Sequence, residues 1–413
     1  MGALCASLEC EHVDVRAIIL LGAEAEASAK ETSLIPANSS QPDAERLLGF
    51  PVGALDLLGQ PVVCHVIDRL KSYGISEISL LTSSRLPEGM KAKISAEVDL
   101  VECASEDVWG TAEATFLRLA SQRPDSVMIL RIGAYAEVDF HQLLKFHFAR
   151  RNGATIVCDH LGYPLDIVAL DPSRKIEAIH VISQNMRWNW RASEIFHSYG
   201  YVNLLRDGKD FRRLAEDALM RRCALIPRGQ ELKPGVWVGK HARIHRNATI
   251  EGPTFIGDQA KVGAGTFLSG CSTLEHHCRV DQRTLVDNST VLPYSYVGES
   301  LNLVQSVVGF SQIAQVKRNA TVSIADAKLT GVIAATTLKR TLNPMRAVLS
   351  KVSQTLADRF QGKDADQIPA DPRSIEPQVD EFVMNVAPQK ENAHAAAASA
   401  SRQGKVKRRA THN

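Results

Sequence analysis

"VGKHARIHRNATIEGPTFIGDQAKVGAGTFLSG", residues 238–270, decides the fold of the second half of this chain, because an aliphatic side chain returns at every sixth position. The period continues beyond the quoted stretch and places these residues in one series: Val238, Ile244, Ile250, Ile256, Val262, Leu268, Leu274, Val280, Val286 and Leu292. A small residue stands four positions after each of them except the last: Ala242, Ala248, Thr254, Ala260, Thr266, Ser272, Cys278, Thr284 and Thr290. A period of six matches neither an α-helix, whose period is about 3.6 residues, nor a flat strand, whose period is about 2.

A six-residue period is typical of a short strand and a tight turn that repeat along a solenoid, in which each coil buries a face of its neighbour. One aliphatic side chain per flat side then points to the axis, and the small residue fits the crowded corner. We therefore predict a left-handed parallel β-helix of hexapeptide repeats over residues 232–313. The phase is lost after Leu292, where we expect an irregular last coil that caps the open end.

A β-helix of this kind is first of all a rigid spacer or a platform for the assembly of subunits. The alternative is a hexapeptide acyltransferase, in which a histidine between coils acts as the general base. His276 and His277 have the right chemistry for that role. They lie inside a hexad with no long substrate loop nearby, so we favour solvated corner side chains for both.

The first half alternates strand-like and helix-like patterns, which predicts a mostly parallel sheet with helices on both faces. Ligands of such sheets bind beyond the carboxyl ends of the strands. The polar, proline-containing segment 29–45 is expected to form a flexible loop in that region. The expected strands are Ala17–Leu21, Glu77–Leu81, Val98–Val101, Val127–Ile132 and Ala154–Val157, and the expected helices cover about 61–73, 111–121 and 139–151.

Composition and charge are those of an ordinary globular protein: 413 residues, 45% hydrophobic and 23% charged, with a formal net charge of +2. That charge gives no reason to expect a nucleic-acid partner. The eight cysteines are scattered, which indicates reduced, mostly buried thiols. No apolar run approaches the ~18 residues of a membrane span, and the N-terminus has no signal-peptide pattern. We expect a cytoplasmic protein with no transmembrane segment.

Several short motifs of the first half occur in an order and spacing similar to those of a known family. They are "AIIL" at Ala17, "LLGQPVVCHVIDRLKSYGISEISL" from Leu57, "GTAEA" at Gly110, "GAYAEVDFHQLLKFH" from Gly133, "GATI" at Gly153 and "GYV" at Gly200. With the β-helix after them, they resemble the sugar-phosphate nucleotidyltransferases, or NDP-sugar pyrophosphorylases, of the mannose-1-phosphate guanylyltransferase type. The likeness covers roughly residues 15–310. It implies a Rossmann-like, GT-A-like nucleotidyltransferase domain over residues 15–225.

Members of that family join a nucleoside triphosphate to a sugar 1-phosphate and release pyrophosphate. The resemblance therefore implies a site with backbone N–H donors in a glycine loop, fixed cations, and carboxylates that hold Mg²⁺. This chain departs from the family pattern at each of these parts.

The glycine loop is the first departure. The family pattern, similar to Ala-Ala-Gly-x-Gly-Thr-Arg, falls on residues 21–27, where both glycines are replaced by alanine and the arginine by Ala27. Glu24 and Glu26 bring negative charge to the place of the triphosphate. We interpret this segment as a reshaped loop that no longer binds a triphosphate, and a loop refolded around Lys30 is the alternative.

The fixed cation and the metal carboxylate are missing as well. The lysine of the family's Pro-Lys pair falls on Val52, and the metal-binding aspartate falls on Ala134. The sugar-contacting Glu-Lys pair falls near Val181 and Ile182. We therefore assign no catalytic residue and no metal ligand. We predict no cofactor, with Mg²⁺ implied only if the protein is an active enzyme.

A few residues remain as candidates for ligand binding. Gly110 and Thr111 open a helix whose N–H groups can hold an anion or a ribose. Asp139 also opens a helix, where its other interpretation is an N-cap. The full set is Gly22, Gly110, Thr111, Gly133, Asp139 and Gly200.

The two ends of the chain carry further expectations. Residues 1–14 are predicted to form an N-terminal extension, 314–362 a capping segment with an amphipathic helix, and 363–413 a disordered tail with a basic, solvated end. The helix at 337–360 is expected to close the β-helix, pack on a partner subunit or lie on a membrane surface, in that order of preference.

These residues predict a catalytically weak or inactive member of the family. Such a protein would bind a nucleotide sugar or a sugar phosphate, or serve as a scaffold subunit, in polysaccharide biosynthesis. We expect a homo-oligomer or a partner of an active relative. The alternatives are an active sugar-1-phosphate nucleotidyltransferase and a hexapeptide acyltransferase.

Overall fold

The structure is a computed structural model that describes residues 13–22, 46–82, 86, 88–96, 98–104, 107–150, 153–183 and 194–333. Several predictions lie outside these residues: those for most of the extension 1–14, for the loop residues 23–27 and Lys30, for the segment 29–45, for the helix at 337–360 and for the tail 363–413.

A seven-stranded sheet forms the centre of the first half, with strands in the order β12-β10-β11-β8-β1-β6-β7. The strands β7, β6, β1 and β8 run parallel, whereas β11 is antiparallel to both β8 and β10. The expected mostly parallel sheet is therefore confirmed. The strands are β1 (Val15–Leu21), β6 (Glu77–Thr82), β7 (Asp99–Glu102), β8 (Ser126–Arg131), β10 (Ala154–Cys158), β11 (Pro164–Leu170) and β12 (Glu194–His197).

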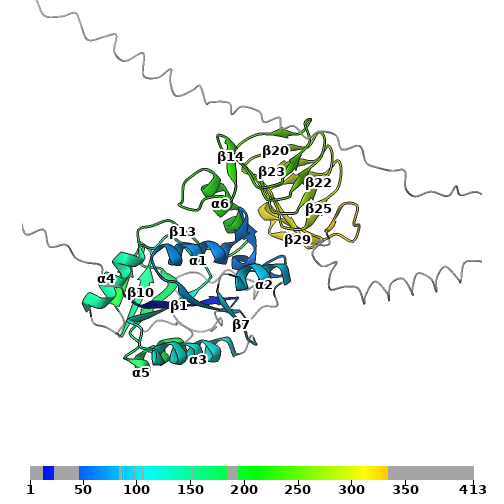
Figure 1. The fold of residues 1–413 in the computed structure, drawn as a ribbon. Helices are drawn as coiled ribbons and strands as arrows, with labels where there is room; N and C mark the ends of the chain where they lie inside the picture. The colour runs from blue at the N-terminus through cyan, green and yellow to red at the C-terminus, as the bar shows by residue number, and fades with distance from the viewer. Residues whose placement is uncertain are drawn as a thin grey trace, which may run out of the picture.

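Helices cover both faces of this sheet (Figure 1). One face packs on α1 (Val62–Ser72), α2 (Glu88–Ser95) and α4 (Phe140–Arg150), and the other on α3 (Val108–Ser121) and α5 (Lys175–Ser183). Because side chains alternate along a strand, neighbours such as Ile18 and Ile19 of β1 enter different cores.

Helix α1 shows how the sequence fixes these elements. Pro61 precedes it, and Gly74, whose φ is +85°, follows its last turn. A proline before a helix and a glycine in left-handed conformation after it are typical boundaries. The helix buries one stripe against the sheet, made of Val62, Val63, Val66, Ile67 and Leu70.

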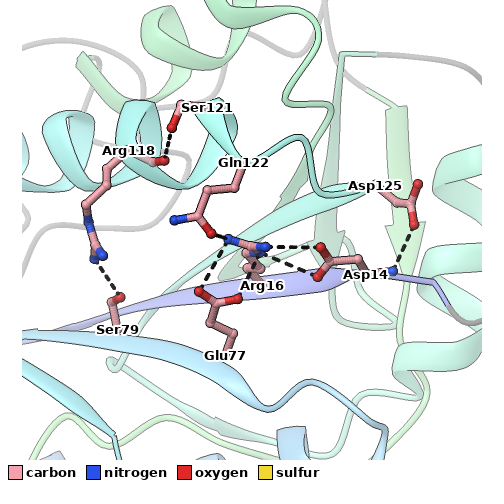
Figure 2. Close-up of polar contacts among 8 residues, drawn as sticks. All are labelled: Asp14, Arg16, Glu77, Ser79, Arg118, Ser121, Gln122 and Asp125. Atoms are coloured by element: carbon pink, nitrogen blue, oxygen red, sulfur yellow. Dashed lines mark hydrogen bonds and ion pairs between the residues drawn. The ribbon is translucent and has the colours of Figure 1, made fainter.

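Charged residues gather at the amino end of β1, around Arg16 (Figure 2). Its guanidinium forms ion pairs with Asp14 and Glu77 and a hydrogen bond with Gln122. Arg16 is only 8% exposed, so this cluster satisfies a buried cation and joins β1 to β6 and the end of α3. It lies at the edge of the sheet opposite to the expected ligand site.

A series of short elements leads from the sheet to the second half. Two hairpins, β2 (Arg46–Leu47) with β3 (Phe50–Pro51) and β4 (Asp56–Leu57) with β5 (Gln60–Pro61), flank the 3₁₀ turn η1 (Val52–Ala54). Strands β9 (Tyr135–Ala136) and β13 (Val202–Asn203) pair with each other, and α6 (Gly208–Leu219) follows. Helix α3, of 14 residues, is the longest described helix, and among the described residues no helix is long and apolar enough to span a membrane.

Residues 230–333, the C-terminal sheet region, form three sheets in which most neighbouring strands are parallel. Val236 pairs with Thr254, eighteen positions further along, and Lys261 pairs with Arg279 at the same interval. The first sheet contains β14 (Gln230–Lys233), β15 (Val236–Val238), β18 (Thr254–Ile256), β21 (Thr273–Leu274), β24 (Thr290–Val291), β27 (Ser306–Gly309), β28 (Gln312–Gln315) and β29 (Ala320–Ser323). The second contains β16 (Arg243–Ile244), β19 (Lys261–Val262), β22 (Arg279–Val280), β25 (Ser295–Val297) and β30 (Thr330–Val332), and the third β17 (Thr249–Ile250), β20 (Phe267–Ser269), β23 (Leu285–Asp287) and β26 (Asn302–Val304).

The six-residue series is interrupted one hexapeptide earlier than predicted, directly after Val286. Leu274 pairs with Val291, seventeen positions further along, so Val291 takes the interior place that we expected for Leu292. Thr273 pairs with Thr290, so Ser289, one position before Thr290, is aligned with Ser272. Ser289 therefore takes the corner that we expected for Thr290. Leu292 is buried instead in the core shared with the first half.

The region after Leu292 is also more regular than expected. The interior series continues through Val297, Leu303 and Val308, and β25, β26 and β27 add to the three sheets. The antiparallel strands β28 and β29 then follow β27. The predicted irregular last coil is therefore wrong for residues 295–309.

Arg212 of α6 connects the first half to the C-terminal sheet region through hydrogen bonds. Its guanidinium donates to Thr290 Oγ1 at 2.7 Å, to the Cys271 carbonyl at 2.8 Å and to Asn288 Oδ1 at 2.9 Å. Burial lowers the pKa of Arg212 to about 10, so the side chain stays charged at neutral pH. The planar fork of an arginine guanidinium suits these three acceptors.

Candidate functional site

The carboxyl edge of the seven-stranded sheet is where a ligand is expected. Strand β1 is flanked by β6 on one side and β8 on the other, so the strand order reverses at β1. Open α/β sheets bind ligands at such a switch point, beyond the carboxyl ends of the strands. Strand β1 ends at Leu21 and is followed by Gly22, whose φ is +72°, and β8 ends at Arg131.

The turn η1 covers these strand ends and contains the position of the missing lysine. A Cβ on Gly53 would stand 2.4 Å from Ile132 Cγ2 and 3.1 Å from Leu21 Cδ1, so the backbone of η1 lies directly on both strands. Val52 is 1% exposed. The position where the resembling family keeps a cation is therefore closed apolar core, with no room for a phosphate contact.

The end of β8 carries no carboxylate at the position of the metal-binding aspartate. The Gly133 amide donates to the Arg131 carbonyl at 2.9 Å, and the half-buried Ala134 follows. Asp166 of β11 is paired with the Arg131 guanidinium. Nor do the described residues contain a group of three or more histidines, cysteines and carboxylates that is placed to hold a metal. The residues at this strand end therefore do not fit the Mg²⁺ that the family implies.

Gly110 and Thr111 lie in the first turn of α3, which starts beyond the carboxyl end of β7. The Thr111 hydroxyl donates to the Asp107 carbonyl at 2.8 Å, so it serves the helix itself. A Cβ on Gly110 would stand 2.5 Å from Asp107 Oδ1. The Asp107 side chain makes no cap hydrogen bond, which leaves the amides of this turn to other acceptors.

Asp139 and Gly200 have structural roles. Asp139 Oδ1 accepts from the Gln142 amide at 3.1 Å, which is the N-cap interaction at the start of α4. A Cβ on Gly200 would stand 1.9 Å from the Glu137 carbonyl oxygen, so only glycine permits this approach. Ile182 is fully buried between α5 and the sheet, which places that residue away from any sugar.

A second polar cluster joins the hairpin β4–β5 to the C-terminal sheet region, and the sequence analysis missed it. Asp56 Oδ2 lies 2.8 Å from His276 Nε2 and 3.1 Å from Lys93 Nζ. The Glu275 carboxylate accepts from the amides of Leu58 at 2.7 Å and Gly59 at 2.8 Å. Neither carboxyl side chain is open to solvent, since Asp56 is 1% and Glu275 0% exposed.

The expectation of a solvated corner is wrong for His276. Its Nε2 faces Asp56, and its Nδ1 lies 3.1 Å from His277 Nδ1. The ring is 17% exposed. Nε2 is engaged with the first half and Nδ1 with the adjacent His277, which disfavours His276 as the general base of an acyltransferase. Burial and the neighbouring His276 lower the pKa of His277, which is half-buried.

The two buried carboxylates of this cluster have opposite electrostatic surroundings. Burial alone would raise the pKa of Asp56, but the His276 hydrogen bond and the Lys93 charge outweigh burial and keep the pKa below its ordinary value. Burial raises the pKa of Glu275 to about 8, the charge of Asp56 adds to the rise, and the two backbone donors oppose it. The Glu275 carboxyl therefore binds a proton more tightly than an ordinary carboxyl does.

A large cavity, about 810 Å³ in volume, lies elsewhere. It is bounded by the hairpin β2–β3, the start of α6 and the strands β28 and β29. Arg206 at its edge is already paired with Asp210. None of the predicted ligand-binding residues lines this cavity, so it does not mark the site expected from the sheet topology.

Comparison with known proteins gives two partial similarities. The chain is 32% identical over 102 residues to UTP–glucose-1-phosphate uridylyltransferase of Synechocystis sp., a match that covers 24% of this chain and 26% of that protein. It is 28% identical over 125 residues to probable mannose-1-phosphate guanylyltransferase 2 of Oryza sativa subsp. japonica, covering 28% and 34%. The matches thus span about a quarter and a third of the relatives' lengths. No family model matches the chain.

Proposed function

We propose, from the premise that this chain is related to the sugar-phosphate nucleotidyltransferases, that it binds a nucleotide sugar or a sugar phosphate without catalysing the transfer at an ordinary rate. The relatives' names supply the ligand class. The expected loss of turnover follows from the groups that this chain lacks at its strand ends, the lysine at Val52 and the aspartate at Ala134. The proposal covers the carboxyl edge of the sheet, between the end of β1 and the first turn of α3.

The burial of Val52 is the observation that carries this proposal. A valine that is 1% exposed cannot contact a triphosphate, and a charged side chain at the same place would lose its hydration without a partner. Removing one preorganised electrostatic group costs an enzyme ~10²–10³ in rate. Losing the lysine, the loop arginine and the metal aspartate together would cost roughly 10⁵ or more, even with strong non-additivity.

Binding needs less than turnover does. The first turn of α3, which the Asp107 side chain does not cap, offers amide donors at the carboxyl edge, and Gly110 is exposed there. Helix N-termini favour phosphates through these donors and through the helix dipole. A nucleotide sugar carries fewer negative charges than a triphosphate with a sugar phosphate, so it places a smaller demand on cations.

The C-terminal sheet region is proposed to be a left-handed β-helix of hexapeptide repeats that assembles subunits of this chain or of an active relative. The support is the six-residue interior series, the eighteen-residue interval between paired strands and the small buried corner residues such as Ala260 and Thr266. Such stacked coils leave long regular side faces that suit subunit contacts.

Calorimetric titration with UDP-glucose and GDP-mannose tests the binding site. We expect one of the two to bind the wild-type protein, and Gly110→Asp to weaken that binding at least tenfold, because it sets a carboxylate beside the phosphate. The matched control is Ser121→Asp, which places the same charge at the other end of α3 and is expected to leave the affinity unchanged. Equal loss in both variants, or no binding by the wild type, would refute the site.

A further inference from the structure

The hairpin β4–β5 reaches from the first half to the C-terminal sheet region. Leu58 and Gly59 form its two-residue turn, with φ of +56° and +104°. Two residues with positive φ fit the type I′ turn that matches the twist of a tight hairpin. A Cβ on Gly59 would stand 2.9 Å from Arg228 Cβ and 3.4 Å from Phe255 Cζ, so the turn is enclosed where it meets the second half.

The polar groups of this turn are satisfied from other elements. The Leu58 and Gly59 amides donate to Glu275, and the Arg228 amide donates to the Leu58 carbonyl at 2.9 Å. Lys93 of α2 donates to the Gly59 carbonyl at 2.9 Å. Buried backbone groups are costly when they lack a partner, so the two amides of the turn depend on the docked C-terminal sheet region for their acceptor.

The same hairpin is joined directly to the turn η1, which covers the strand ends and forms the floor of the proposed ligand site. Asp56, held by His276 and Lys93, stands three residues after Gly53, whose backbone lies on the ends of β1 and β8. Two further bonds brace this link: the Leu55 amide donates to the Val52 carbonyl, and the Val62 amide to the Leu55 carbonyl, both at 3.1 Å. A shift of the hairpin therefore moves the turn that covers the strand ends.

We infer that Glu275 and His276 are positioning residues: from the C-terminal sheet region they hold the hairpin β4–β5, and through it the floor of the ligand site. Docking of the two halves and the shape of the site are then one equilibrium. A subunit contact that loosens the C-terminal sheet region lowers the ligand affinity, and bound ligand tightens the docking. The identity of the ligand and the place of its site at the carboxyl edge rest on the proposed function.

The charges around Glu275 make this equilibrium proton-dependent. The Glu275 carboxyl faces Asp56 of the hairpin and Lys93 of α2. Glu275 also lies next to His276 and interacts at longer range with Arg212 of α6. A carboxyl whose pKa is raised when docked binds a proton more tightly in that state. Docking is therefore favoured most below the ordinary carboxyl pKa, and this advantage is lost as pH rises toward about 8.

Hydrogen exchange of the Leu58 and Gly59 amides, with the ligand absent, tests the inference. Glu275→Gln replaces one accepting oxygen by an NH₂ group, which then faces one of the two amide donors. We expect the protection of the Leu58 and Gly59 amides to fall at least tenfold. The matched control is Glu251→Gln, the same substitution at an exposed position of the C-terminal sheet region, which should leave protection unchanged. Unchanged protection in Glu275→Gln would overturn the inference.

A second readout begins with the wild-type protein, so its first result does not depend on how well the variants fold. In the wild type, protection of the two amides, corrected for intrinsic exchange, should fall between pH 5 and pH 8 and then level off. His276→Gln replaces the imidazole but keeps a donor for Asp56, and should shift this profile without abolishing protection. A flat wild-type profile would contradict the proton-dependent coupling. Nucleotide-sugar affinity that is absent while both exchange results hold would refute the proposed function and leave the positioning role intact.

Discussion

The Leu58 amide nitrogen lies 2.7 Å from the Glu275 carboxylate, although the two residues are 217 positions apart in the chain. With Arg212 and Thr290, which lie 2.7 Å apart across the same junction, this bond makes the two halves of the molecule one packed unit. The buried core shows the same continuity, because Phe255, Leu292 and Val307 belong to the cluster that also contains α1 and α4.

Glu275→Ala should destabilise the junction strongly. The substitution leaves the Leu58 and Gly59 amides buried without an acceptor, and each such group costs about 1–3 kcal/mol. We expect a clear fall in the unfolding temperature, measured by calorimetry. Glu251→Ala is the control and should change it little; an equal effect in both variants would argue against a specific junction contact.

Arg212→Met should cost about 3 kcal/mol or more, because three acceptors from the C-terminal sheet region lose a charged donor. Arg212→Lys should rescue only part of the loss, since an ammonium cannot reproduce the fork. Denaturant unfolding measures both. The neighbouring Arg213, whose side chain is 72% exposed, provides the control: Arg213→Met should stay within about 0.5 kcal/mol.

His65 should make stability fall in mild acid. Burial lowers its pKa to about 4, against the hydrogen bond that His65 Nε2 donates to the Leu57 carbonyl. A histidine whose pKa is lowered by folding contributes stability above its ordinary pKa, and that contribution is lost as pH falls from about 6.5 to about 4. Unfolding followed across this range should show the slope in the wild type. The same slope in His65→Gln would assign it to another group.

Val52→Lys should not create an active site. The side chain is closed inside the core, and burying an ammonium costs several kcal/mol even after relaxation. We expect a large loss of stability and no gain in pyrophosphate release. Val322→Lys, at a valine that is 56% exposed, is the control for the added charge. A stable Val52→Lys protein with new turnover would show that this position opens toward the ligand.

Val291→Ala tests which residue faces the interior at the seventeen-residue step. Full burial of a valine contributes about 1.5–3 kcal/mol, and Val291 is fully buried in the interior series. We expect a loss near that size on thermal unfolding. Val304, which is 41% exposed, gives the control, and Val304→Ala should have a small effect. Similar losses would place Val304 in the interior.

The order of five strands and three helices of the first half was predictable from the sequence because it depends on periodicity, whereas β11, β12, α2, α5 and α6 were not predicted. The alternating patterns predicted the parallel strands, and the six-residue series predicted interior residues from Ile244 to Val286. The step at Val291 was not predictable. Val291 and Leu292 are adjacent aliphatic residues, and either one satisfies the pattern; only the pairing of Leu274 selects between them.

The candidate site was predictable only where one residue decides the chemistry. The loss of the lysine at Val52 is readable from its type, and the structure adds that the position is closed. The cluster of Asp56, Glu275 and His276 was not predictable, because it joins segments more than 200 positions apart. A signal was present all the same, since Asp56 interrupts an otherwise apolar run from Val52 to Leu58.

Pyrophosphate release measured for a panel of nucleoside triphosphates and sugar 1-phosphates with Mg²⁺ tests the central claim most directly. The account predicts rates at least about 10⁵-fold below the ~10 s⁻¹ of an ordinary enzyme for every combination. Turnover near ordinary rates for any one pair would contradict it, because Val52 is closed in the core and the end of β8 has Ala134 in place of the metal-binding aspartate, so neither position supplies the cation or the metal ligand that the reaction needs.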